Sequence, residues 1–191
     1  MSGPRHQELA EVVRAYLVGL RGGAPFLSSA DARLLKRWLD QELPLWFILE
    51  GLDKAAAKRR GRRLRTPLSL QHAKAFVKPG DDPAPRVSGL SRLVRELSAH
   101  ADPEVRRLSA ELADAPTCEA AVARITQWHE SRWERADRQP WLQRAADELA
   151  DLSDLVSEER FKSLCAETAR DLMRQQVPAL CASRVWDTVE G

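Results

Sequence analysis

The amino-acid sequence predicts an all-α protein, a bundle of about nine helices arranged as one or two helical modules. Apolar residues recur at spacings of three and four along most of the 191-residue chain, which is the period of an amphipathic helix. Capping residues or prolines begin these stretches, and most of them end at glycine or proline. No stretch of useful length alternates apolar and polar residues as a half-buried strand does, and no internal repeat stands out.

The first two helices have clear end signals. The first lies in GPRHQELAEVVRAYLVGLRGG, where the apolar face stops at the pair Gly22 and Gly23. The second follows the serines of FLSSADARLLKRWLDQELP, which suit an N-cap. It closes before Pro44, because a residue that precedes proline disfavours the helical conformation.

The third helix is predicted to start at Pro44 and to break at Gly61. Its basic C-terminus complements the helix dipole. A short fourth helix, LSLQHAKAFV, follows Thr66 and Pro67. The inward-facing stripe predicted for the third helix consists of Trp46, Phe47, Leu49, Leu52 and Ala56.

A proline-rich segment divides the chain. KPGDDPAPRVSG holds three prolines and two glycines in twelve residues, a composition that cannot continue a helix. We therefore expect an N-terminal helical module over residues 1–79, a linker over 80–88 and an acidic C-terminal helical module over 89–191. The two modules can pack into one body.

Five further helices are predicted after the linker. Each opens on a capping or proline signal, such as Asp102-Pro103, Thr117 or Ser157. The predicted stretches are residues 88–101, 102–115, 117–137, 139–155 and 157–176.

The charge of the chain is unevenly spread. The net charge is only +2, but residues 1–99 hold 18 Lys/Arg and 10 Asp/Glu, whereas residues 100–191 hold 12 and 18. Between Lys54 and Lys78 there are nine basic residues and no acidic one, so carboxylates nearby in sequence do not neutralise this segment. An anionic ligand is therefore expected there.

Neither membrane insertion nor export is indicated. The longest apolar runs, such as LPLWFIL, are far shorter than the roughly 20 residues that cross a bilayer. Charged residues and a histidine interrupt the N-terminus where a secretory signal needs an apolar core. The expected location is the cytoplasm.

Enzyme and metal signatures are mostly absent from the sequence. Cys118, Cys165 and Cys181 form no CxxC pair and are expected to be buried thiols, so neither a metal nor another cofactor is predicted. HESRW begins like a metalloprotease HExxH helix, but Trp133 stands where the second histidine ligand would be. A helical enzyme for an anionic substrate remains an alternative, in which His72 or His129 meets carboxylates in a pocket.

The strongest candidate is the basic segment that opens with KRRGRRLR. Lysine and arginine neutralise nucleic-acid phosphates, and the arginine fork can hold a phosphate bidentately. The opposing interpretation is a solvated helix end, which would equally suit an acidic protein surface. The predicted nucleic-acid-binding residues are Lys58, Arg59, Arg60, Arg62, Arg63, Arg65, Lys74 and Lys78.

Residues 26–77 resemble a segment found in bacterial proteins. RWLDQELPLWFILEGLDKA, followed by basic residues and a short helix, resembles uncharacterised bacterial helical proteins and, more distantly, the C-terminal helical domain of DnaD-like replication-initiation proteins. That family binds DNA and primosome partners. Here LSLQHAKAFV stands in place of the family's YxxxIxxxW ending. The resemblance implies that Lys58 to Arg65 face nucleic acid and that the core contains Trp38, Leu39, Ile48, Leu49 and Leu52.

The sequence thus predicts a non-enzymatic, nucleic-acid-associated adaptor without sequence specificity, whose acidic C-terminal helices dock a protein partner. The alternative is a protein-interaction or assembly subunit that binds no nucleic acid. In that alternative, the tail VPALCASRVWDTVEG is exposed and inserts Val185 and Trp186 into a groove of the partner.

Overall fold

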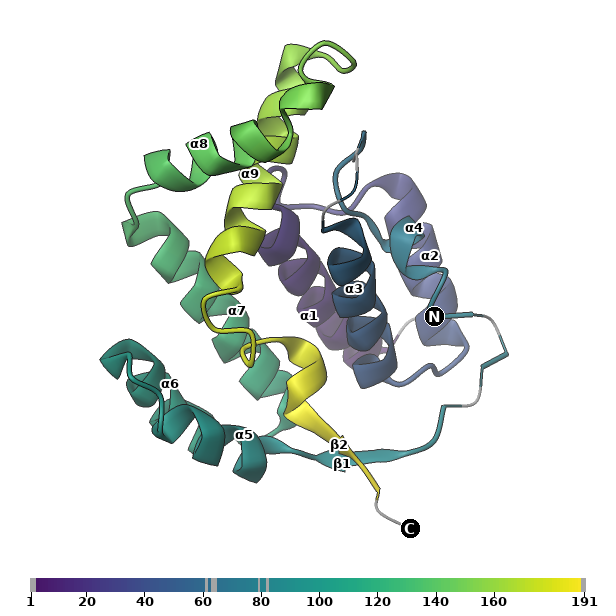
Figure 1. The fold of residues 1–191 in the computed structure, drawn as a ribbon. Coiled ribbons are helices and arrows are strands. Elements are labelled where there is room, and N and C mark those ends of the chain that lie inside the picture. The colour runs from purple at the N-terminus through teal and green to yellow at the C-terminus, as the bar shows by residue number, and fades with distance from the viewer. Residues whose placement is uncertain (1–2, 61, 63–64, 79, 82, 190–191) are drawn as a thin grey trace.

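The computed structural model describes residues 3–60, 62, 65–78, 80–81 and 83–189 (Figure 1). Within this part the protein is an all-α bundle, which confirms the predicted fold class. Its nine described α-helices are α1 (Pro4–Arg21), α2 (Ser29–Asp40), α3 (Leu45–Arg59), α4 (Leu70–Ala73), α5 (Leu90–Ser98), α6 (Pro103–Ala113), α7 (Cys118–Arg135), α8 (Gln139–Glu148) and α9 (Glu158–Arg174).

Short elements complete the described chain. They are the 3₁₀ helices η1 (Ala150–Leu152) and η2 (Ala182–Val185) and the strands β1 (Arg86–Ser88) and β2 (Trp186–Thr188). The two strands pair antiparallel, with Val87 opposite Asp187. Strand β1 lies in the predicted linker, so part of that segment pairs with the end of the chain.

Local signals end α1 and begin α2 as predicted, whereas α4 covers only four of the ten residues predicted to be helical over 68–77 and the helix predicted over 139–155 ends at Glu148. The Ser28 side chain accepts a hydrogen bond from the backbone N–H of Asp31 and caps α2. Gly22 follows α1 with a φ of 72°, a left-handed conformation that glycine adopts without strain. Gly51 lets α3 approach the segment after α4, because a Cβ at this position would lie 2.3 Å from Cγ2 of Val77. That close approach brings the basic end of α3 beside α4.

One hydrophobic core joins the two predicted modules. It runs from Val13 of α1 to Trp186 of β2 and includes residues of α5, α6 and α7. A second, smaller cluster packs α8 and α9 with Trp133 at the end of α7. The five side chains that the resemblance places in the core are all buried, namely Trp38, Leu39, Ile48, Leu49 and Leu52. Trp46 and Phe47, predicted to face inward, are only partly buried.

The C-terminal tail belongs to this core. After α9 the chain runs back through the bundle, and η2 contacts α3, α5 and α7 (Figure 1). The side chain of Val185 is 0% exposed and that of Trp186 is 9% exposed. The expectation of an exposed tail that offers these two residues to a partner is therefore wrong, because both side chains are used in the protein's own core.

Two further features bear on the sequence predictions. No helix of the described chain is long and apolar enough to cross a membrane. Cys118, Cys165 and Cys181 are free thiols, and burial raises the pKa of each.

Candidate nucleic-acid-binding segment

The eight predicted phosphate-binding residues fall into three groups. Arg59 is buried and Arg60 is ion-paired, so both serve the fold. Arg63 lies outside the described residues. The other five are exposed and form no ion pair with a described carboxylate; they are Lys58, Arg62, Arg65, Lys74 and Lys78.

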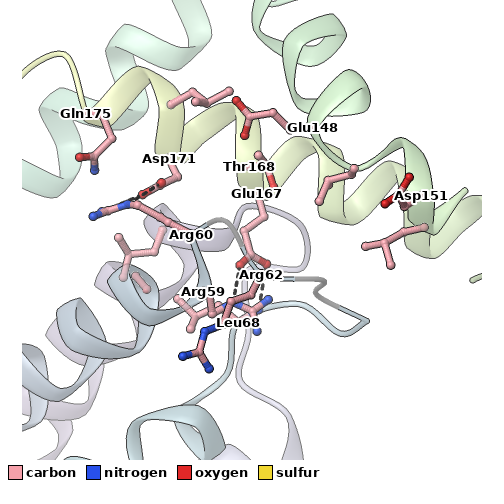
Figure 2. A pocket seen from close by; sticks show the side chains of 15 residues that line it. Arg59, Arg60, Arg62, Leu68, Glu148, Asp151, Glu167, Thr168, Asp171 and Gln175 are labelled. Carbon is pink, nitrogen blue, oxygen red and sulfur yellow. Dashed lines mark hydrogen bonds and ion pairs between the residues drawn. The ribbon is translucent and has the colours of Figure 1, made fainter.

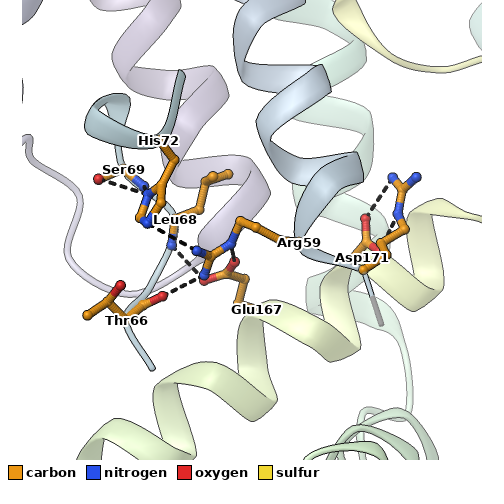
Figure 3. Close-up of polar contacts among 8 residues, drawn as sticks. Arg59, Thr66, Leu68, Ser69, His72, Glu167 and Asp171 are labelled. Carbon is orange, nitrogen blue, oxygen red and sulfur yellow. Dashed lines mark hydrogen bonds and ion pairs between the residues drawn. The ribbon is translucent and has the colours of Figure 1, made fainter. Parts of the chain in front are cut away.

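Arg59 ties the basic loop to α9 (Figure 3). Its Nε donates to Oε1 of Glu167 at 3.0 Å, and its Nη2 donates to the Thr66 carbonyl at 2.6 Å. The second Glu167 oxygen accepts the backbone N–H of Leu68 at 2.8 Å. One buried ion pair therefore satisfies backbone groups on both sides of Pro67 and holds the loop against the bundle.

His72 completes this network from the start of α4. Its Nδ1 accepts the backbone N–H of Ser69 at 3.0 Å, and its Nε2 lies 3.3 Å from Nη1 of Arg59. Burial, and then the neighbouring guanidinium, lower the pKa of His72. Burial raises the pKa of Glu167, although Arg59 opposes this shift. Both effects favour the neutral imidazole, and its described hydrogen-bond partners include no carboxylate.

Arg60 makes a second, more exposed link to α9 (Figure 2). Its Nε and Nη2 donate to the two carboxylate oxygens of Asp171 at 2.7 and 3.0 Å, a bidentate geometry. The hydrogen bonds to Asp171 raise the pKa of Arg60. Because Glu167 and Asp171 are four residues apart on α9, one helix face receives both arginines.

A cleft opens between this loop and the α8–α9 hairpin. Its volume is about 540 Å³, and much of its lining consists of leucines, namely Leu20 of α1, Leu68 of the loop, Leu149 after α8, Leu152 of η1 and Leu172 of α9. Arg59, Arg60 and Arg62 lie on one side, opposite Glu148 and Asp151 (Figure 2). Because both signs of charge meet here, the cleft does not extend the basic surface.

The exposed cations lie around the junction of α3 and α4. The Nζ atom of Lys58 lies 5.7 Å from the ring centroid of Phe76, which places the end of α3 beside the turn between Lys74 and Lys78. Phe76 packs its ring partly against the core. This arrangement brings cations from two parts of the sequence to one region of the surface, whose positive field favours anions.

The other candidate histidine, His129, is structural. It is buried on α7, and its Nε2 lies 2.9 Å from the carbonyl oxygen of Leu180, to which it donates. The described residues contain no group of three or more His, Cys, Asp or Glu side chains that could hold a metal ion. Neither histidine thus has the carboxylate partner among the described residues that the enzyme alternative requires.

Stability is expected to depend on pH through His129. Burial, and then Arg174, place the pKa of His129 well below its usual value near 6.5. As the pH falls through about 6.5 the unfolded chain binds a proton that the folded chain does not, so the free energy of unfolding falls by up to about 1.4 kcal/mol per pH unit. His72 contributes with the same sign. Urea unfolding at a series of pH values measures this slope.

The variant His129→Gln provides the comparison, because its amide nitrogen can take the position of Nε2 and donate to the Leu180 carbonyl. Its stability should fall less steeply between about pH 7 and pH 5. Identical slopes in the parent and the variant would contradict a neutral, buried His129.

A polar network that sequence reasoning missed anchors the tail. The Tyr16 hydroxyl donates to Oδ1 of Asp53 at 2.5 Å and accepts the backbone N–H of Ala182 at 2.9 Å. The other Asp53 oxygen accepts the backbone N–H of Ser183 at 2.8 Å. Burial raises the pKa of Asp53. The sequence offers one signal for this network: Asp53 stands four residues after Leu49 and three before Ala56, on the stripe of α3 predicted to face inward.

Comparisons with protein-family models, curated proteins and solved structures found no match for this chain. Evidence on its function therefore comes from its own residues.

Proposed function

We propose that this protein is a non-enzymatic, nucleic-acid-associated adaptor that binds the phosphate backbone without sequence specificity. The observation that carries the proposal is the set of five exposed cations whose side chains form no ion pair with a described carboxylate, around a loop that Arg59 and Arg60 hold in place. The phosphate-binding residues are Lys58, Arg62, Arg65, Lys74 and Lys78.

The proposal differs from the sequence prediction in the residues that it uses. Arg59 donates hydrogen bonds to Glu167 and Thr66, and Arg60 donates to Asp171. Both arginines therefore position the loop rather than contact phosphate. The acidic helices of the C-terminal half remain the surface for a protein partner, as the adaptor role requires.

The test is fluorescence-anisotropy binding to short oligonucleotides across a salt series. The triple variant Lys58→Ala, Arg62→Ala and Arg65→Ala removes three of the five cations and leaves both ion pairs to α9 intact. Each lost phosphate contact reduces the salt slope of log K by about 0.7–0.9, so we expect a decrease of about 2–3 in the variant.

A matched control removes the same charge elsewhere. Arg95, Arg107 and Arg160 are exposed on α5, α6 and α9, and none forms an ion pair with a described residue. The triple alanine variant of these residues should bind like the parent. Absence of binding by the parent at low salt, or equal slopes in the parent and the first variant, would contradict the proposal and favour the protein-interaction alternative.

A further inference from the structure

Helix α3 carries a polar and aromatic stripe on its partly exposed side. Trp46, Glu50, Lys54 and Lys58 follow one another at intervals of four residues, so neighbouring members lie on adjacent turns. Trp46 and Lys58 are twelve residues apart, which is about 18 Å along the helix. The stripe therefore spans nearly the whole length of α3.

An aromatic ring with a cation over it lies at each end of the stripe. The Arg86 guanidinium carbon is 4.6 Å from the Trp46 ring centroid, and the Lys58 ammonium is 5.7 Å from that of Phe76. Both rings are partly exposed and pack partly against the core. Cation–π contacts at such exposed sites are weak, about 0.5–1 kcal/mol. A ligand ring that stacks well can thus displace these cations.

Cations predominate between the two rings. Glu50 accepts both Lys54 at 2.7 Å and Arg86 at 2.8 Å, so a single carboxylate serves two cations. At the other end, Lys58 pairs with no described carboxylate. At this end of α3 a cation that suits a phosphate therefore lies beside a ring that suits a base.

A cavity beside Trp46 adds an independent observation. It measures about 400 Å³ and is lined by Trp46 and Trp186, by leucines from α1, α2 and α3, and by the polar side chains of Arg5, His6, Glu42 and Glu119. This volume lies within the range of ligand pockets. The Nδ1 atom of His6 is buried and has no hydrogen-bond partner among the described residues. A cavity lined by two tryptophan rings and an unpartnered imidazole nitrogen suits a planar base.

We propose that single-stranded nucleic acid, rather than a duplex, is the ligand, and that it lies along α3 with bases stacked on Trp46 and Phe76. A duplex keeps its bases stacked on one another, whereas a single strand can present them to aromatic side chains. This inference rests on the proposed function, because Lys58, one of the proposed phosphate-binding residues, supplies a phosphate contact for the same strand.

The experiment compares oligothymidylate, which does not self-pair, with a duplex of equal length. The variants Trp46→Leu and Phe76→Leu replace each ring by an apolar side chain that still fills the core. Each should bind the single strand at least about fivefold more weakly at an unchanged salt slope, because stacking and not charge is lost. Duplex binding should not change. Phe161→Leu, at a partly buried ring of the second cluster, is the control.

Thermal unfolding of each variant verifies that the fold is retained. Parent protein that binds duplex as tightly as single strand, or leucine variants that bind the single strand like the parent, would overturn this inference. The proposed function would then still stand if Lys58→Ala, Arg62→Ala and Arg65→Ala reduce the salt slope. Parent protein that binds neither oligonucleotide at low salt would overturn both.

Discussion

Replacing Arg59 by alanine is expected to lower the free energy of unfolding by about 3–5 kcal/mol, because it leaves the buried Glu167 carboxylate without its cation. The Thr66 carbonyl loses its donor at the same time. For a chain of this length, each kcal/mol lowers the melting temperature by about 2–4 °C. Urea unfolding and a thermal scan measure both quantities.

The neighbouring Arg60 is the matched control. Its side chain is 44% exposed and its ion pair with Asp171 lies at the surface, so Arg60→Ala should cost about 1 kcal/mol or less. The double variant Arg59→Met and Glu167→Met removes both buried charges and should be more stable than Arg59→Ala alone. Equal losses for Arg59→Ala and Arg60→Ala would show that burial does not distinguish the two arginines.

This difference decides how nucleic-acid binding has to be tested. A variant that combines Arg59 with its neighbours lowers affinity by unfolding the loop, whatever the loop contacts. Only substitutions of the exposed cations can change phosphate binding without also changing the stability of the fold. Lys58, Arg62 and Arg65 meet that condition, because no described side chain depends on them for an ion pair.

The helices were predictable because their determinants are local. Ser28 caps α2 through its own hydroxyl, Pro44 separates two helices, and Gly22 stops α1 in a left-handed conformation. Each of these signals acts within about four residues of its position, so the sequence displays it directly.

The partners of the basic segment were not predictable in the same way. Glu167 and Asp171 lie 108 and 111 residues from the arginines that they bind. Counting acidic residues near the segment in sequence therefore overestimated its uncompensated charge. The sequence did contain one signal for these partners. Glu167 and Asp171 are four residues apart on an amphipathic helix, and two such carboxylates can face inward only when cations pair with them.

The tail illustrates a second limit of sequence reasoning. In the protein-interaction alternative, VPALCASRVWDTVEG was expected to be exposed. The structure buries its apolar residues because backbone groups of Ala182 and Ser183 find partners in Tyr16 and Asp53. Burial of an irregular segment requires such partners for its backbone, and they come from helices more than 120 residues earlier.

Val185→Asp is expected to destabilise the protein by at least about 3 kcal/mol. Val185 is 0% exposed in the main core, where a carboxylate loses its hydration. Because the tail packs against α3, α5 and α7, its release should expose the centre of the bundle as well. Urea unfolding, together with the binding of a hydrophobic dye, measures both effects.

Val189→Asp makes the same chemical change four residues later, at a side chain that is 52% exposed. It should alter the free energy of unfolding by no more than about 0.5 kcal/mol, as is usual for surface substitutions. If the two variants were equally stable, the tail would not be part of the core in solution. Val185 and Trp186 would then again be available to a partner, as the exposed-tail interpretation of the sequence requires.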